Sequence, residues 1–113
     1  GVVRFYRAMA GTTVDNFFFD KLLRELHPSD ALVYLTIWRH SYGAGKPTAK
    51  ISTGDLAQYT GLSMTTVQTS VKSLVETKLL ARRRESATAI TEYQAKRPWR
   101  KKAAAAPATD KKS

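Results

Sequence analysis

Apolar side chains recur at helical spacing in the second half of the chain. Val67, Val71 and Leu74 follow one another at intervals of four and three residues, and threonine, glutamine and lysine occupy positions between them. This pattern predicts an amphipathic helix with a single apolar stripe. A shorter segment with an apolar side precedes it, and Gly61 lies between the two, where a tight turn needs a residue that tolerates positive φ. The stretch 52–76 therefore predicts two helices joined by a tight turn.

Each of these two helices has a polar residue at its expected start. Ser52 offers a hydroxyl to the free backbone amides of the first helix, and Asp55, three residues later, places a carboxylate near the positive helix end. Ser63 takes the same capping position before the second helix. The capping residues therefore mark both helix starts independently of the apolar pattern.

Another helix is expected near the beginning of the chain. Residues 14–26 place Phe18, Leu22 and Leu26 on one stripe, and Pro28 ends this helix because the residue before a proline avoids helical angles. The adjacent phenylalanines at 17–19 cannot all face inward from one helix. We therefore expect at least one of them to contact another chain or the N-terminal arm.

The helix expected after Pro28 is apolar on nearly every side. We expect Ser29 to cap its start and Gly43 to end it. A helix without a polar face is usually buried, so this segment predicts the central helix of the core.

Short strands are expected on either side of the helix pair. We expect Ile51 to form a one-strand bridge with its side chain in the core, and residues 79–84 and 89–93 predict a hairpin with residues 85–88 as its turn. Ile90 is expected to return to the core from the second strand. Side chains alternate along the first strand, with Leu80, Arg82 and Arg84 on one face and Leu79, Ala81 and Arg83 on the other.

Together these elements resemble the winged-helix DNA-binding proteins, such as the MarR and GntR regulators and the winged domains of plasmid and phage replication initiators. The residues that match are Ala57, Gly61, Leu62, Ser63, Thr66, Val67, Val71, Leu74, Leu79 and Leu80. The resemblance spans roughly residues 29–93. It implies a mainly α fold with a small β-hairpin, a winged helix-turn-helix of three to four helices plus the wing.

Two residues depart from the family pattern. Lys78 stands where many relatives have a glycine after the second helix, so a different or strained turn is expected there. Ser70 stands where an apolar residue is common, which predicts a locally polar contact.

The charge of the chain is strongly positive. Nineteen Lys and Arg against nine Asp and Glu give a net charge of +10 and an isoelectric point near 10.2, which suits a polyanionic partner. We divide the chain into an N-terminal arm at 1–13, a winged-helix domain at 14–93 and a basic tail at 94–113, with disorder expected beyond about Arg100. The tail holds much of the excess positive charge.

A helix in the major groove of DNA presents its N-terminal side chains to base edges. Gln68 is the leading candidate for base readout, because its amide can bond N6 and N7 of adenine at once. The full set of candidates is Ser63, Met64, Thr65, Thr66, Gln68 and Thr69.

Contacts to the DNA backbone are expected from basic residues and from the start of the first helix of the pair. The candidates are Lys50, Ser52, Thr53, Lys72, Arg82, Arg83 and Arg84, with further tail contacts from Lys96, Arg97, Arg100, Lys101 and Lys102. The three arginines could instead be a solvated strand edge that discourages aggregation. Trp99 could stack on nucleic acid or pack against the domain, and the sequence leaves both open.

The sequence shows no pattern typical of a zinc site or a phosphate-binding loop. There is no cysteine, and His27 and His40 have no spacing suited to zinc. The segment GAGKPT is not a phosphate-binding loop, because the earlier glycine that the motif requires falls on His40. We expect no catalysis, no cofactor, no small-molecule ligand and no membrane partner, and a cytoplasmic location.

The leading hypothesis is therefore sequence-specific binding of double-stranded DNA in plasmid or phage replication, partition or transcriptional regulation. A homodimer is possible, since palindromic sites need two-fold proteins. The alternative is a protein-interaction winged helix whose phenylalanine cluster and arm are the working surface. Binding of RNA or single strands is a third, minor hypothesis.

Overall fold

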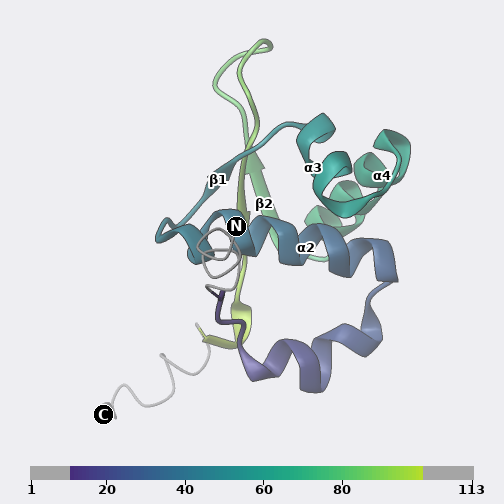
Figure 1. The fold of residues 1–113 in the computed structure, drawn as a ribbon, viewed down its shortest axis with the longest axis vertical. Coiled ribbons are helices and arrows are strands. Elements are labelled where there is room, and N and C mark those ends of the chain that lie inside the picture. Colours follow the sequence, from purple (N-terminus) through teal and green to yellow (C-terminus); the bar gives the residue numbers. More distant parts are fainter. Residues whose placement is uncertain (1–10, 101–113) are drawn as a thin grey trace, which may run out of the picture.

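The computed structural model describes residues 11–100, in which helices pack beside a small antiparallel sheet (Figure 1). In chain order the elements are the π-helix η1 (Phe18–Leu22), the 3-10 helix η2 (Leu23–Glu25), α2 (Pro28–His40), the 3-10 helix η3 (Tyr42–Ala44), β1 (Ala49–Lys50), α3 (Thr53–Thr60), α4 (Met64–Glu76), β2 (Leu80–Arg83) and β3 (Glu92–Ala95). The predicted fold class, mainly α with a small β component, is confirmed. Predictions for residues 1–10 and 101–113 lie outside the described residues.

The sheet has the strand order β1-β3-β2, with both pairings antiparallel. The predicted bridge before α3 is present one residue early, at Ala49–Lys50, while Ile51 donates its amide to the Thr91 carbonyl at 3.2 Å. The Ile51 side chain is buried, as expected. The hairpin loop between β2 and β3 extends away from the helices, as a wing does (Figure 1).

The second strand of the wing begins later than predicted. It runs over Glu92–Ala95, so the predicted domain boundary at residue 93 falls inside it. The prediction that Ile90 returns to the core is wrong, because Ile90 is 56% exposed. Tyr93 and Ala95 are buried instead. Because a strand's side chains alternate between faces, these two residues fix a register that leaves Ile90 in the loop.

The helix α2 is the centre of the core, as predicted. Its buried side chains Val33, Tyr34, Ile37 and Trp38 pack in one cluster with residues from the other elements. Those residues include Phe18, Ile51, Leu56, Val67, Val71, Leu74, Leu80, Tyr93 and Ala95. The helix-turn-helix therefore rests on α2 and the sheet.

The predicted helix pair is confirmed as α3 and α4. The Ser52 hydroxyl accepts from the Asp55 amide at 3.0 Å, and the Ser63 hydroxyl accepts from the Thr66 amide at 3.1 Å. Gly61 ends α3 with a φ of 78°. The stripe of Val67, Val71 and Leu74 is buried.

Ser70 makes the polar contact that the sequence predicts. Its side chain is buried in the face that α4 turns to α2, and its hydroxyl donates to the Ser29 hydroxyl at 3.0 Å. Contrary to the prediction, Ser29 lies inside α2 and is not its cap. The helix begins at Pro28 with His27 in the capping position, since a proline in the first turn loses no helical hydrogen bond.

The other end of α2 also differs from the prediction. The helix ends at His40 rather than Gly43, and the buried Ser41 donates its hydroxyl to the Ile37 carbonyl at 2.7 Å. The 3-10 helix η3 follows, and Gly45, with a φ of 77°, closes it. This early ending turns Tyr42 toward β3, where its hydroxyl donates to the Ala95 carbonyl.

The single regular helix predicted over 14–26 is wrong in form. The segment winds first as a π-helix and then as a 3-10 helix. Phe18 is fully buried and its ring stacks on Tyr34 at 5.6 Å, and Leu22 and Leu26 pack at the border of the core. The predicted apolar stripe therefore still faces the core, although the segment does not wind as a regular α-helix.

Lys78 follows the end of α4, and its φ of 66° lies in the left-handed region. A residue with a Cβ atom is destabilised there by about 1–2 kcal/mol. Glycine avoids this steric cost, and its only disadvantage is its greater conformational entropy in the unfolded chain. We expect Lys78→Gly to raise the free energy of unfolding by up to about 1 kcal/mol in a denaturant titration. Lys78→Ala keeps the Cβ atom and should give no such gain; equal effects of the two substitutions would contradict this account.

Residues 96–100 pack against the start of the described chain. The Trp99 ring stacks on Phe17 with centroids 4.8 Å apart, and its indole donates to Asp15 Oδ2 at 2.7 Å. Arg100 donates to both carboxylate oxygens of Asp15, at 2.6 and 2.5 Å. Of the two alternatives left open for Trp99, packing against the domain is the one that the structure shows. Phe17 thus contacts Trp99, while Phe19 stays 53% exposed.

These contacts make a pH-dependent contribution to stability. Hydrogen bonds from Arg100 lower the pKa of Asp15 from 3.8 to about 2; burial opposes this shift and the Trp99 indole adds to it. A lowered carboxyl pKa stabilises the fold above the ordinary value, and this stability is lost as the pH falls from about 4 to about 2. We expect Asp15→Asn to cost about 1 kcal/mol at pH 7, with the difference from wild type shrinking across that range. A difference that stays constant from pH 6 to pH 2 in urea titrations would show that the charge of Asp15 is not involved.

Candidate nucleic-acid interface

The N-terminal half of α4 presents polar side chains to solvent. Met64, Thr65, Gln68 and Thr69 are exposed, and Thr66 is half-buried. Residues on the opposite face are held in the core, so the burial of the apolar stripe aims this face outward.

The six readout candidates differ in how much hydrogen-bonding capacity they have left. The Ser63 hydroxyl also donates to Thr66 Oγ1 at 2.9 Å, and Thr69 Oγ1 donates to the Thr65 carbonyl at 3.0 Å. Ser63 and Thr66 are thus tied into the helix cap. Among residues 11–100, the Gln68 amide has no hydrogen-bond partner, so all its donors and acceptors remain available to a ligand.

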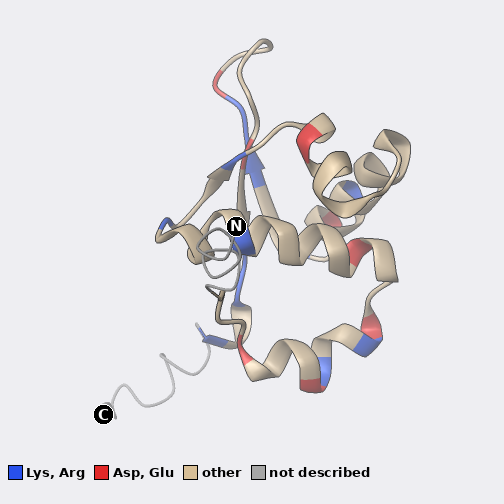
Figure 2. Cartoon of the chain, viewed as in Figure 1, with Lys and Arg blue, Asp and Glu red and all other residues tan. Residues whose placement is uncertain are grey.

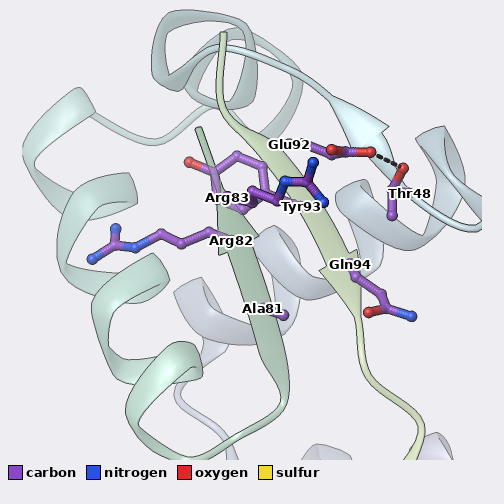
Figure 3. Close-up of a pocket in the computed structure, with 7 residues that line it drawn as sticks. All are labelled: Thr48, Ala81, Arg82, Arg83, Glu92, Tyr93 and Gln94. Atoms are coloured by element: carbon purple, nitrogen blue, oxygen red, sulfur yellow. Dashed lines mark hydrogen bonds between the residues drawn. The ribbon is translucent and has the colours of Figure 1, made fainter. Parts of the chain in front are cut away.

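Gln68 shares one open cleft with the wing arginines. The cleft holds about 570 Å³ and is lined by Thr53, Gln68, Arg82, Arg83, Arg84, Thr91 and Tyr93. In the close-up of β2 and β3, Arg82 reaches from β2 toward α4 (Figure 3). The fold therefore brings together the candidate base reader, the start of α3 and the arginine run.

The arginines of this cleft are not held in ion pairs, although Arg84 donates a hydrogen bond to the Ala87 carbonyl at 3.3 Å. In the part of the chain that the structure describes, the one ion pair is that between Asp15 and Arg100, so Arg82, Arg83 and Arg84 have no carboxylate partner there. Figure 2 shows basic residues on β1, β2 and the base of the wing, with acidic segments between them on the wing and the neighbouring strand. A strand edge that only needs to stay soluble does not require three consecutive arginines, of which Arg82 reaches toward α4.

Arg83 and Lys50 lie on a different face of the sheet from Arg82. Both are cross-strand neighbours of Glu92, which forms the middle of a row across the three strands. Thr48 donates its hydroxyl to Glu92 Oε2 at 2.5 Å (Figure 3). The carboxylate offsets part of the positive charge of this row. Lys50 does not line the cleft of Gln68.

The remaining predicted backbone contacts are placed as follows. Ser52 is half-buried, and its hydroxyl is used in the cap of α3. Lys72 is exposed one turn after Gln68 on α4. Thr53 lines the cleft at the first position of α3, where free backbone amides and the helix dipole favour an anion.

The predicted tail contacts are not brought to this cleft. Arg97 lies with its guanidinium carbon 3.6 Å from the centroid of the Tyr42 ring, and Arg100 pairs with Asp15. Residues 96–100 occupy the end of the molecule opposite the wing loop (Figure 1). Lys96 is exposed there, and Lys101 and Lys102 lie outside the described residues.

Two residues of the cleft, Thr91 and Tyr93, were not among the candidates. Both belong to the second half of the predicted hairpin, so its returning strand was the signal that could have found them. Their place opposite β2 follows from the strand register, which the arginine run alone does not reveal.

Other kinds of site were also sought in residues 11–100. Within this range no three His, Asp or Glu side chains gather in a way that could hold a metal ion. None of the described helices is long and apolar enough to cross a membrane.

Comparison with known proteins agrees with this geometry. A family model described as a helix-turn-helix domain matches residues 24–80. One similar solved structure is described as the "N-Terminal domain of DNA binding protein"; it aligns with a TM-score of 0.59 and 13% identity, over 84% of this chain and 80% of that chain. No curated protein matches the sequence. Since the family model spans just over half of the 113 residues, and the wing follows it in the structure, the chain belongs to the helix-turn-helix family, in its winged form.

Proposed function

We propose that this winged helix binds double-stranded DNA with sequence preference, without catalysis. In this proposal α4 enters the major groove, and its exposed residues Met64, Thr65 and Gln68 meet the base edges. Gln68 is well suited to bidentate contact with an adenine, since none of its amide groups is used within the described fold. The description of the similar solved structure as a DNA-binding protein supports the proposal.

Affinity would come mainly from the arginines rather than from α4. The recognition helix carries a single lysine, Lys72, and one acid, Glu76, so it has no net charge of its own. Arg82, Arg83 and Arg84 supply three positive charges beside it, and the chain as a whole carries +10. Neutralising phosphates releases condensed counterions, which makes such binding strong at low salt.

One observation carries the proposal: Gln68 and the three unpaired arginines line the same cleft. A helix that served only to complete the core would not need a free amide beside a run of three arginines. The same arrangement suits replication, partition or transcriptional regulation, each of which begins with recognition of a DNA site.

Selecting bound duplexes from a random pool tests the proposal. We expect enrichment of a short motif, and at least tenfold tighter binding of the selected duplex than of a scrambled duplex in fluorescence anisotropy at about 0.15 M salt. Equal affinity for both duplexes would leave only non-specific binding. Tighter binding of single strands would favour the single-strand hypothesis.

A second candidate, protein interaction, is favoured by exposed apolar side chains that do not line the cleft. Phe19, Leu23 and Leu32 are each exposed by about two-fifths or more. A homodimer on a palindromic site would also find an apolar contact here. Light scattering at micromolar concentration, with and without the selected duplex, tests this surface; monomer under both conditions would remove the homodimer.

A further inference from the structure

A second basic pocket lies apart from the cleft of Gln68. It is an open pocket of about 300 Å³ where the end of α2, the loop before β1 and the helix α3 meet. Its polar lining consists of Arg39, His40, Lys46, Lys50, Asp55 and Tyr59. None of these residues lines the cleft of Gln68, so the two sites are distinct.

The pocket has more positive than negative charge. Arg39, Lys46 and Lys50 face it from α2, the loop and β1, while Asp55 on α3 is the single acid in the lining. None of the three cations forms an ion pair within residues 11–100. All three side chains are exposed, so an incoming anion could reach them.

His40 lines the same pocket, and its pKa depends on the charges beside it. Its ring packs against Tyr59 with centroids 4.4 Å apart, and its Nδ1 atom is 3.4 Å from the Thr36 carbonyl oxygen. Burial lowers the pKa of His40, and the positive charges of Arg39 and Lys46 lower it further. These surroundings favour the neutral His40 ring, and a bound anion would counteract the effect of the two positive charges.

We propose that this pocket binds a phosphate group. A guanidinium and two ammonium groups from three separate elements can surround an anion, and protonated His40 can add a fourth positive charge. The exposed Tyr59 ring, with 64% of its surface free, forms the rim beside them. The phosphate could come from the backbone of DNA that extends past the cleft or from a free phosphorylated molecule, since both present the same group. The first source rests on the proposed function, whereas the second does not.

The two histidines allow a direct test by NMR. Their ring protons report each pKa separately, and His27 is an internal control because it caps the opposite end of α2. We expect 10 mM pyrophosphate, compared with sodium chloride at equal ionic strength, to raise the pKa of His40 by roughly half a unit or more and to leave His27 unchanged. An unchanged His40, or equal shifts of both histidines, would overturn the proposal.

A matched pair of double variants distinguishes phosphate binding in this pocket from a general effect of positive charge. Arg39→Gln with Lys46→Gln should raise the pKa of His40 in the free protein and abolish its response to pyrophosphate. Lys21→Gln with Arg24→Gln removes the same charge from exposed positions of η1 and η2 and should keep the response. A response that persists in the Arg39 and Lys46 variant would also overturn the proposal.

Salt titrations with duplexes of two lengths identify the source of the phosphate. If DNA supplies it, the Arg39 and Lys46 variant should lose up to about 1.8 from the salt slope on a 30-base-pair duplex. The loss should disappear on a duplex cut down to the selected motif. A pyrophosphate response with no change on either duplex assigns the pocket to a free phosphorylated ligand. If no duplex binds at all, the proposed function fails, and the pyrophosphate measurement still decides the pocket.

Discussion

Replacing Arg82 and Arg84 together with glutamine is expected to weaken binding to every duplex, by about sixty-fold at 0.1 M salt. Each lost phosphate contact removes about 0.9 from the slope of log affinity against log salt, so two contacts remove about 1.8. The reason is geometric: both residues line the cleft beside α4 and have no acidic partner in the described structure. Preference among sequences should change little, because phosphate contacts carry no base information.

The measurement is fluorescence anisotropy of the selected and scrambled duplexes between 0.05 and 0.3 M salt. Lys21→Gln with Arg24→Gln is again the matched control, since it removes the same net charge from the end of the molecule opposite the wing (Figure 2). An equal loss of affinity in the control would mean that overall charge, rather than the cleft, drives binding.

Gln68→Ala is expected to relax sequence preference at one base pair while leaving non-specific affinity nearly unchanged. A bidentate contact between an amide and adenine is worth about 1–3 kcal/mol, which corresponds to roughly 5- to 150-fold discrimination. Gln68 is exposed on α4 and its buried neighbours Val67 and Val71 fix the helix face. The variant should therefore fold normally, and circular dichroism can verify this before binding is measured.

Selection from the random pool, repeated with the variant, provides the measurement. Gln94→Ala is a suitable control, since Gln94 is an exposed glutamine on β3 that points away from α4 (Figure 3). Identical motifs for wild type and Gln68→Ala would remove Gln68 from base readout. The proposal of duplex binding would survive that result, with Met64 and Thr65 as the remaining exposed readers.

The helix pair was predictable because its signals are local. Ser52, Gly61 and Ser63 act on backbone groups within four residues, and the stripe of α4 repeats at helical spacing. The strained backbone at Lys78 was predictable for the same reason, because a lysine stands where many winged-helix proteins have a glycine. Such features depend little on the remainder of the fold.

The predictions that failed depend on contacts between distant parts of the chain. Phe18 of η1 packs on Tyr34 of α2, and Tyr93 and Ala95 of β3 are buried in the core. Ile90 has the composition of a strand residue, yet its exposure is decided by the register of β3. The second basic pocket was missed because Arg39, Lys46 and Tyr59 come together only when α2, the loop and α3 are packed.

The contact between Asp15 and Arg100 has a practical consequence for engineering. Because it holds residues 15 and 100 side by side, the described chain enters and leaves the fold at one pole, far from the wing (Figure 1). A fluorescent protein or a second DNA-reading module fused before residue 11 or after residue 100 would be attached at that pole. Tandem arrays could thus be joined through short linkers without covering the recognition helix.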